Sequence, residues 1–382
     1  MLTQGQRVVA RATEEKRFGT GECPVEYGRR MDRKGEAMTS VKDIEVVEPP
    51  ADGDLGRGTF TFSDRYSVFD WGPMPDTIPG KGASLCTMGA FNFELFADAG
   101  IPTHYRGVIP PEGDDPTSIA NCESPPTVMA IDLAMVPELP ETGDGYDYET
   151  FHQEAGESFV VPLEVIFRNR VPIGSSLRRR LEPADVGLSY STWPDEPIEL
   201  DDPIVEFSTK FEQSDRYLKA EEAAAIAGVA SLESIEELAH GVNEIITEQA
   251  TATGLRHDDG KIEVVYHAGD HLVADVAGTF DENRFTQEGQ QLSKEVIRQF
   301  YKRFHPEWTD AVSLAKQEAK EADRHDWKAF CEIDPKPLPE AVIEAVSIMY
   351  TAGADTYTEL GLFGGEELPA VLDHLDPVLH PG

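Results

Sequence analysis

The chain has 382 residues and carries 71 acidic residues against 33 lysines and arginines, a formal net charge of −38. A surface this acidic repels a phosphate backbone, so nucleic-acid binding is not expected. No apolar run is long enough to span a bilayer, and four scattered cysteines form neither a disulfide framework nor a zinc motif. We therefore expect a cytoplasmic protein with no membrane partner, and the spread of its acids indicates a cytoplasm rich in salt.

The first 37 residues differ from the rest in charge. Residues 1–37 hold eight basic residues against six acidic ones, whereas the remainder of the chain is strongly acidic. Two interpretations stay open: a natural start at Met38 with a non-native extension upstream, or a disordered basic arm. The mass of the native N-terminus would distinguish them.

Residues 38–158 are expected to form an N-terminal, mainly antiparallel, nucleotide-binding lobe. Alternating apolar and polar residues predict strands over 43–47 and 58–69, joined by a loop rich in Gly and Asp. The next pattern predicts an amphipathic helix over 83–99 that stops at a glycine, with a proline beyond. A further strand is predicted over 128–136, followed by an acidic segment with at most a short helix.

Residues 159–290 are expected to form a central lobe with a mixed sheet that binds substrate and Mg-ATP, followed by a C-terminal helical segment over 291–382. Apolar and β-branched residues predict a buried strand over 159–168. The pattern then predicts a long helix over 219–250 and two strands, over 261–266 and 271–276. Strands first and helices later indicate a two-lobed α+β fold.

Arg168 stands at the end of the predicted buried strand and precedes a turn that contains Gly174 and Ser175. A guanidinium next to a Gly-Ser turn with free backbone N–H groups is suited to holding a phosphate or a carboxylate. A solvated basic turn that pairs with surface acids is the alternative. It suits the arginines at 178–180 better than Arg168, which follows an apolar strand.

Two lysine motifs are weaker indications. Lys81 lies between two glycines at the start of a predicted helix, which could form an anion site or an ordinary helix-start loop. Lys210 and Glu212 could contact a polyphosphate and ribose hydroxyls, respectively. A strand edge with a surface ion pair explains the second motif better from its local sequence alone.

Lys261 and Glu263 are two residues apart on one predicted strand and therefore share a face of the sheet. Asp275 lies near the end of the partner strand of the same predicted hairpin. Glu263 and Asp275 could meet as two oxygen ligands for Mg²⁺, which takes one or two carboxylates plus nucleotide phosphates. Arg284 would then supply another phosphate contact, while a cross-strand ion pair is the alternative for Lys261.

Eight motifs in this order resemble the SAICAR synthetase (phosphoribosylaminoimidazole-succinocarboxamide synthase) family over about residues 39–305. They are VKDI, SDRYSVFDWG, IPGKG, AFNFELFADAGIPTHY, PLEVIFRNRVPIGSSL, DPIVEFSTKFEQ, GKIEV and DVAGTFDENRF. The resemblance implies that ATP drives the ligation of L-aspartate to carboxyaminoimidazole ribonucleotide in purine biosynthesis, with Mg²⁺ as cofactor. The products would be the succinocarboxamide, ADP and phosphate, and a homo-oligomer stays open.

The resemblance also implies a role for each matching residue. The substrate-binding residues would be Arg168, Ser175, Arg284 and, more weakly, Lys81. The ATP-binding residues would be Lys42, Lys210 and Glu212. The metal ligands would be Glu263 and Asp275. The catalytic residues would be Lys261, between the phosphoryl group and the substrate carboxylate, and Asp275.

The chain departs from the family pattern at a few positions. Thr39 and Ser40 stand where the family usually has Gly-Lys, Val276 stands where a second acid follows Asp275, and Phe280 stands where a proline is usual. These departures fall on the nucleotide and metal sites. Two alternatives therefore remain: another kinase-like ATP phosphotransferase, or a non-catalytic or altered member that binds the ribonucleotide.

Overall fold

The computed structural model describes residues 37–38, 41–51, 53–143, 145–212, 215–322, 324, 326–365 and 367–372. The predicted extension or arm over 1–37 lies outside these residues, apart from residue 37. The departures at Thr39 and Ser40 lie outside them as well.

The first sheet has five antiparallel strands in the order β1-β2-β3-β5-β4. The strands are β1 (Ala37–Met38), β2 (Lys42–Glu48), β3 (Gly56–Phe62), β4 (Tyr105–Ile109) and β5 (Val128–Leu133). The prediction of a strand up to Phe69 was wrong, because β3 ends at Phe62 and the chain then forms a loop. Phe69 and Asp70 in this loop have positive φ angles of 57° and 59°, which extended strands do not allow.

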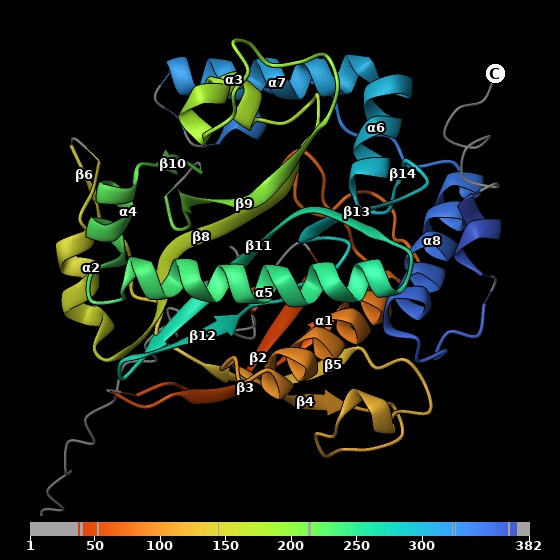
Figure 1. The fold of residues 1–382 in the computed structure, drawn as a ribbon, viewed down its shortest axis with the longest axis horizontal. Coiled ribbons are helices and arrows are strands. Elements are labelled where there is room, and N and C mark those ends of the chain that lie inside the picture. The colour runs from red at the N-terminus through yellow and green to blue at the C-terminus, as the bar shows by residue number, and fades with distance from the viewer. Residues whose placement is uncertain are drawn as a thin grey trace, which may run out of the picture.

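Helix α1 (Lys81–Asp98) packs on the first sheet and against α8 (Glu340–Thr358), the C-terminal helix at the right of Figure 1. The expected amphipathic character was wrong, since twelve of its 18 residues are buried. A helix covered by a sheet on one side and by another helix on the other has little solvent-facing surface, so the polar stripe is lost.

The second sheet has the strand order β10-β9-β8-β11-β13-β14, with β12 paired to β11. Its strands are β8 (Ser158–Val171), β9 (Ile198–Thr209), β10 (Tyr217–Leu218), β11 (Arg256–His267), β12 (Asp270–Ala274), β13 (Asn283–Gln287) and β14 (Gln290–Gln291). Every strand pair described in this sheet is antiparallel, so the expected mixed sheet is an antiparallel one. Helix α5 crosses one face of it (Figure 1).

The helix predicted over 219–250 is divided into α4 (Ala220–Ala227) and α5 (Leu232–Ala252). Gly228 stops α4 with a φ of 66°, and the Ser231 hydroxyl accepts a hydrogen bond from the Ser234 N–H to start α5. The other helices are α2 (Tyr148–Ala155), α3 (Leu177–Arg180), α6 (Glu295–Phe304), α7 (Pro306–Glu321) and the 3-10 turns Ile119–Asn121, Pro183–Val186 and Trp327–Phe330. A separate hairpin consists of β6 (Glu141–Thr142) and β7 (Gly145–Tyr146).

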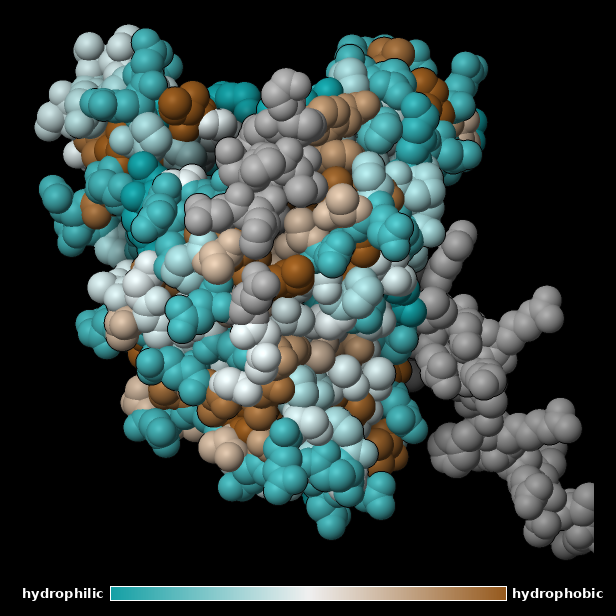
Figure 2. Space-filling view, turned by 90° about the vertical axis from the view of Figure 1, so that its right-hand side faces the viewer, coloured by the Kyte–Doolittle hydropathy of each residue, from teal (hydrophilic) through white to brown (hydrophobic). Residues whose placement is uncertain are grey.

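The two sheets share one main hydrophobic core, which includes buried residues from both. Isolated bridges between Thr103 and Val273 and between Met135 and Phe159 join them. The α+β fold class is therefore confirmed, while the lobe boundaries stay a prediction. On the face over α8, hydrophobic residues lie in separate patches among hydrophilic ones (Figure 2). None of the helices in the described residues has the length and apolar character to cross a bilayer.

Candidate active site

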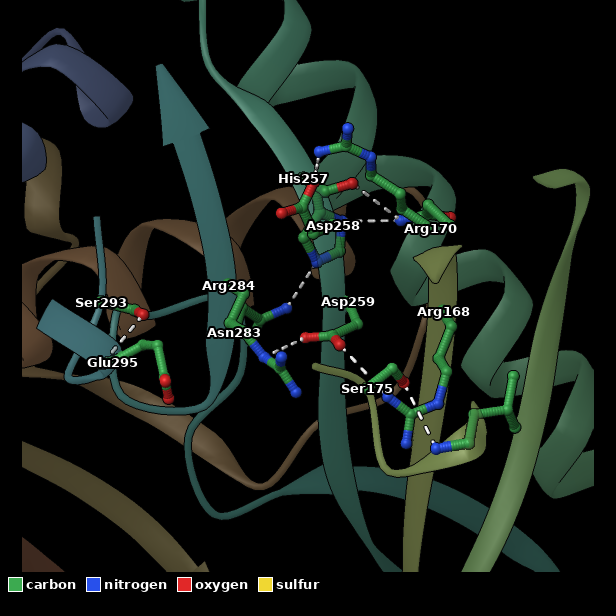
Figure 3. Close-up of polar contacts among 12 residues, drawn as sticks. Arg168, Arg170, Ser175, His257, Asp258, Asp259, Asn283, Arg284, Ser293 and Glu295 are labelled. Carbon is green, nitrogen blue, oxygen red and sulfur yellow. Dashed lines mark hydrogen bonds and ion pairs between the residues drawn. The ribbon is translucent and has the colours of Figure 1, made fainter. Parts of the chain in front are cut away.

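Three charged residues form a row across the second sheet. The strand register places Asp259 of β11 between Arg168 of β8 and Arg284 of β13. Asp259 Oδ2 accepts a hydrogen bond from Arg168 Nη1 at 3.2 Å, and Oδ1 forms an ion pair with Arg284 Nε at 3.0 Å. Figure 3 shows both guanidinium groups beside this carboxylate. The sheet therefore brings the two predicted phosphate-binding arginines together and fixes them through one shared carboxylate.

Arg168 is held from a second side. Its Nε donates to Glu206 of β9 at 2.6 Å, and its Nη2 donates to the Tyr217 hydroxyl at 3.3 Å. Burial lowers the pKa of Arg168, but Asp259 and Glu206 together raise it above its usual value. Its side chain is only 2% exposed. Arg168 is thus a fixed cation. Ser175, predicted beside it, is buried before α3 on the Arg168 side of the site (Figure 3).

Lys261 lies two residues along β11 from Asp259. Its Nζ donates to Glu164 Oε1 at 2.7 Å and is 3.3 Å from Glu282 Oε2. Burial lowers the pKa of Lys261, and the carboxylates of Glu282, Glu164 and Glu263 raise it well above the ordinary value. The ammonium is therefore charged throughout the neutral pH range.

Two further ammonium–carboxylate pairs follow along the sheet. Lys210, just beyond β9, contacts Glu263 of β11, and Lys42 of β2 contacts Asp275, which follows β12. Burial lowers the pKa of Lys210, whereas Glu263 and Asp275 raise it. His104 Nε2 is 3.0 Å from the Asp275 carbonyl oxygen, and Asp275 has a positive φ of 61°. The predicted nucleotide and metal residues thus lie near one another.

Glu263 and Asp275 are candidate oxygen ligands for a magnesium ion. Glu263 Oε2 is buried and has no hydrogen-bond partner among the described residues. The pKa of Glu263 is raised above its ordinary value. Burial is the main cause, Lys210 opposes it, and the nearby Asp275 adds to it. No group of three or more potential ligands was found in the described residues. Mg²⁺ does not need such a group, because substrate phosphates and water complete its coordination.

A cavity of about 330 Å³ lies over the row of Arg168, Asp259 and Arg284 and over Lys261 beside it. Its lining includes Arg168, Arg284 and Lys261, so three of the predicted residues face one hollow. Lys42, Lys210, Glu263 and Asp275 are outside this lining. Glu164 and Lys261 line the cavity and also adjoin Glu263, since Glu164 is its cross-strand partner on β8 and Lys261 is two residues away on β11.

Ser175 is also outside the cavity lining, and two further predicted residues, Lys81 and Glu212, contact other parts of the protein. Lys81 is fully buried, and its Nζ donates to Asp281 Oδ2 at 2.7 Å, while the Tyr350 hydroxyl donates to Asp281 Oδ1 at 2.7 Å. This places the ammonium in a buried ion pair beneath α8 and outside the cavity lining, and the substrate contact of Lys81 stays a prediction. Glu212 accepts from the Tyr148 hydroxyl at 2.9 Å and pairs with Arg216. It lies near Lys210 in sequence, but its described contacts are with these two residues.

Several site residues were missed from the sequence. The carboxylates that fix the predicted cations are Glu164, Glu206, Asp259 and Glu282. One signal was available, because Glu164 is the one acid in the otherwise largely apolar strand β8. An acid in such a position is costly to bury unless a cation faces it.

Comparison with known proteins identifies the family. The SAICAR synthetase family model matches residues 52–315. A Thermoplasma acidophilum protein named phosphoribosylaminoimidazole-succinocarboxamide synthase is 32% identical over 82% of this chain and 95% of its own length. An Archaeoglobus fulgidus protein, provisionally given the same name, is 41% identical over 90% of this chain and 100% of its own length.

A solved structure agrees at the level of the fold. The SAICAR synthase of Saccharomyces cerevisiae complexed with SAICAR has a TM-score of 0.57, covering 87% of this chain and 98% of its own, at 18% identity. The family model covers well over half of the chain, and the two relatives cover most of it. The chain therefore belongs to the SAICAR synthetase family.

Proposed function

We propose that this protein uses ATP to join L-aspartate to carboxyaminoimidazole ribonucleotide, and that the cavity over β8, β11 and β13 is where the ribonucleotide binds. Family membership supports the reaction. The observation that supports the location is the row of Arg168, Asp259 and Arg284 with Lys261 beside it. All three cations line one cavity together with the carboxylates that fix them, Glu164, Asp259 and Glu282.

Arg168 and Arg284 are suited to the ribotide phosphate. Two guanidinium groups on either side of one carboxylate leave further N–H donors for a phosphate, which they can grip through paired hydrogen bonds. Asp259 holds both groups in place before the substrate arrives, so little side-chain entropy is lost on binding. The buried Ser175 hydroxyl is the third proposed contact.

Lys261 is suited to the reacting carboxylate. A carboxylate is a poor acyl donor because its oxygen does not leave, and transfer of the terminal phosphoryl group of ATP turns that oxygen into a leaving group. The amine of L-aspartate then attacks the acyl carbon, the carbon–nitrogen bond forms, and phosphate departs with the oxygen. The chain supplies position and charge, and the fixed ammonium of Lys261 can stabilise the negative oxygens at this centre.

The neighbouring group of lysine–carboxylate pairs, Lys42 with Asp275 and Lys210 with Glu263, is suited to Mg-ATP. Lys42 and Lys210 would contact the polyphosphate, and Glu263 and Asp275 would hold Mg²⁺. Bound magnesium would neutralise negative charge on the phosphates. Glu212 stays the proposed ribose contact, which requires it to exchange one of its present partners.

Replacing Asp275 with asparagine is expected to raise the Mg²⁺ concentration needed for half-maximal turnover by roughly tenfold or more. The change removes one charged oxygen ligand and keeps the shape of the side chain. The measurement is initial rate against free Mg²⁺ at saturating substrates. An unchanged Mg²⁺ dependence would remove Asp275 from the metal site.

The reaction itself is tested by leaving out one reactant at a time. In molar KCl, we expect ADP release and succinocarboxamide formation only when ribonucleotide, L-aspartate and ATP are all present. ADP release without L-aspartate would instead indicate a different phosphotransferase. Ribonucleotide binding with no ATP turnover would indicate a non-catalytic member.

We also propose that the protein works in a salt-rich cytoplasm. Its excess of negative charge repels itself, and molar salt shortens the screening length to about 3 Å. The melting temperature is therefore expected to rise from dilute buffer to molar KCl. A melting temperature that stays level over this range would refute the proposal.

A further inference from the structure

The arginines at 178–180 have no role in the site described above, but the last of them is joined to it. Arg180 Nη2, at the end of α3, donates a hydrogen bond to Glu206 Oε1 at 2.7 Å. The other oxygen of this carboxylate, Oε2, accepts a hydrogen bond from Arg168 Nε at 2.6 Å. Glu206 therefore carries one guanidinium on each oxygen, and it connects Arg180 to the proposed phosphate-binding arginine.

Tyr217 of β10 makes a second link between the same two arginines. The guanidinium carbon of Arg180 lies 3.3 Å from the centroid of the Tyr217 ring, which is a cation–π contact. The hydroxyl of this tyrosine accepts a hydrogen bond from Arg168 Nη2 at 3.3 Å. Arg168 is thus oriented by Glu206, Asp259 and Tyr217, and Arg180 holds the first and the last of these groups.

Five charged side chains therefore alternate in sign across the second sheet. In spatial order they are Arg180 of α3, Glu206 of β9, Arg168 of β8, Asp259 of β11 and Arg284 of β13. The guanidinium groups outnumber the carboxylates by one, which leaves a positive charge for an anionic ligand. Without Arg180 this excess is lost, and Glu206 keeps Arg168 as its one cationic partner among the described residues. A phosphate at Arg168 would then lie near an uncompensated carboxylate and be repelled by it.

We propose that Arg180 is a positioning residue for the ribotide phosphate, because it neutralises Glu206 and supports Tyr217 so that Arg168 keeps N–H donors and positive charge for the ligand. This inference rests on the proposed function. Arg180 is outside the cavity lining, so it acts through Arg168 and does not touch the ligand. Its side chain is 27% exposed, so its removal should cost the fold little. The expected consequence is a loss of ribonucleotide affinity in an otherwise intact enzyme.

The test compares Arg180→Ala with Arg179→Ala. Arg179 is exposed on the same helix, and its side chain makes neither a hydrogen bond nor an ion pair with the described residues, so it controls for the loss of one positive charge. Calorimetry with the ribonucleotide alone should show roughly fivefold to twentyfold weaker binding by Arg180→Ala. In initial rates, its ribonucleotide KM should rise to match, while kcat and the KM values for ATP and L-aspartate stay within about twofold. Arg179→Ala should match the unaltered enzyme.

A double-mutant cycle separates this indirect role from a direct contact. Glu206→Gln removes the charge that Arg180 neutralises, so adding Arg180→Ala to it should change ribonucleotide affinity by less than about twofold. An undiminished effect in that background would overturn the inference, since Arg180 would then act on the ligand itself. Arg180→Lys keeps the charge and should recover most of the affinity, and a lysine variant as weak as the alanine variant would also overturn it.

The same titrations distinguish a failure of this inference from a failure of the proposed function. Equal binding by Arg179→Ala and Arg180→Ala, in an enzyme whose unaltered form binds the ribonucleotide, would contradict the inference alone. An unaltered enzyme that binds no ribonucleotide would contradict the proposed function and, with it, the role of Arg180.

Discussion

Arg168→Ala is expected to weaken ribonucleotide capture and to destabilise the fold at the same time. The guanidinium is buried between Asp259 and Glu206, so its removal leaves two buried carboxylates without their main partner. Breaking a buried pair in this way typically costs about 3–5 kcal/mol of unfolding free energy. Loss of a charged contact to phosphate adds about 1.5–3 kcal/mol of binding free energy, which is roughly a tenfold to hundredfold rise in KM.

Arg284→Ala provides the matched comparison. Its side chain is 34% exposed, so its pair with Asp259 is partly screened and contributes about 1 kcal/mol or less to stability. We therefore expect a similar rise in the ribonucleotide KM with little change in the denaturant midpoint. Both variants are measured by urea unfolding and by initial rates. Unchanged ribonucleotide KM values in both variants would contradict the phosphate assignment.

Lys261→Met is expected to have the largest effect on turnover, lowering kcat by roughly a hundredfold to a thousandfold. That is the usual loss when one fixed donor to a developing negative charge is removed. The change also leaves the carboxylates of Glu164 and Glu282 without the ammonium that neutralises them, so they would repel an anionic substrate. Because the carboxylates hold the pKa of Lys261 well above its ordinary value, its ionisation should not appear in the pH–rate profile near neutrality.

The control for this variant is Lys320→Met, at an exposed position on α7. It removes the same charge far along the chain from the site residues and should leave kcat unchanged. The decisive quantity is kcat at saturating levels of all three substrates. A Lys261→Met enzyme that keeps its kcat and changes only a KM would show that Lys261 binds substrate without assisting the reaction.

The strand patterns and the order of motifs were enough to predict the α+β class and the principal cations. Arg168 was identified because it follows a long apolar run, and Lys261 because it shares a face with Glu263. These are local properties, set by side-chain alternation along one strand. The structure brings Arg168, Lys261 and Arg284 to one cavity, in agreement with that interpretation.

Other features depend on contacts that no local pattern contains. The Gly-Lys-Gly motif suggested an anion site, but Lys81 contacts Asp281, some 200 residues later, under a helix that supplies Tyr350. Likewise, Asp259 binds Arg168 and Arg284 only because three strands align in one register. Register and helix packing across such distances come from the whole core, so the carboxylates that fix the cations were missed.

The most direct test of the central claim is a crystal structure of the enzyme grown with the succinocarboxamide product and ADP. We expect the ribotide phosphate within hydrogen-bond distance of Arg168 and Arg284, and the newly formed amide next to Lys261. Product bound elsewhere, with these three residues still held only by their own carboxylates, would contradict the account.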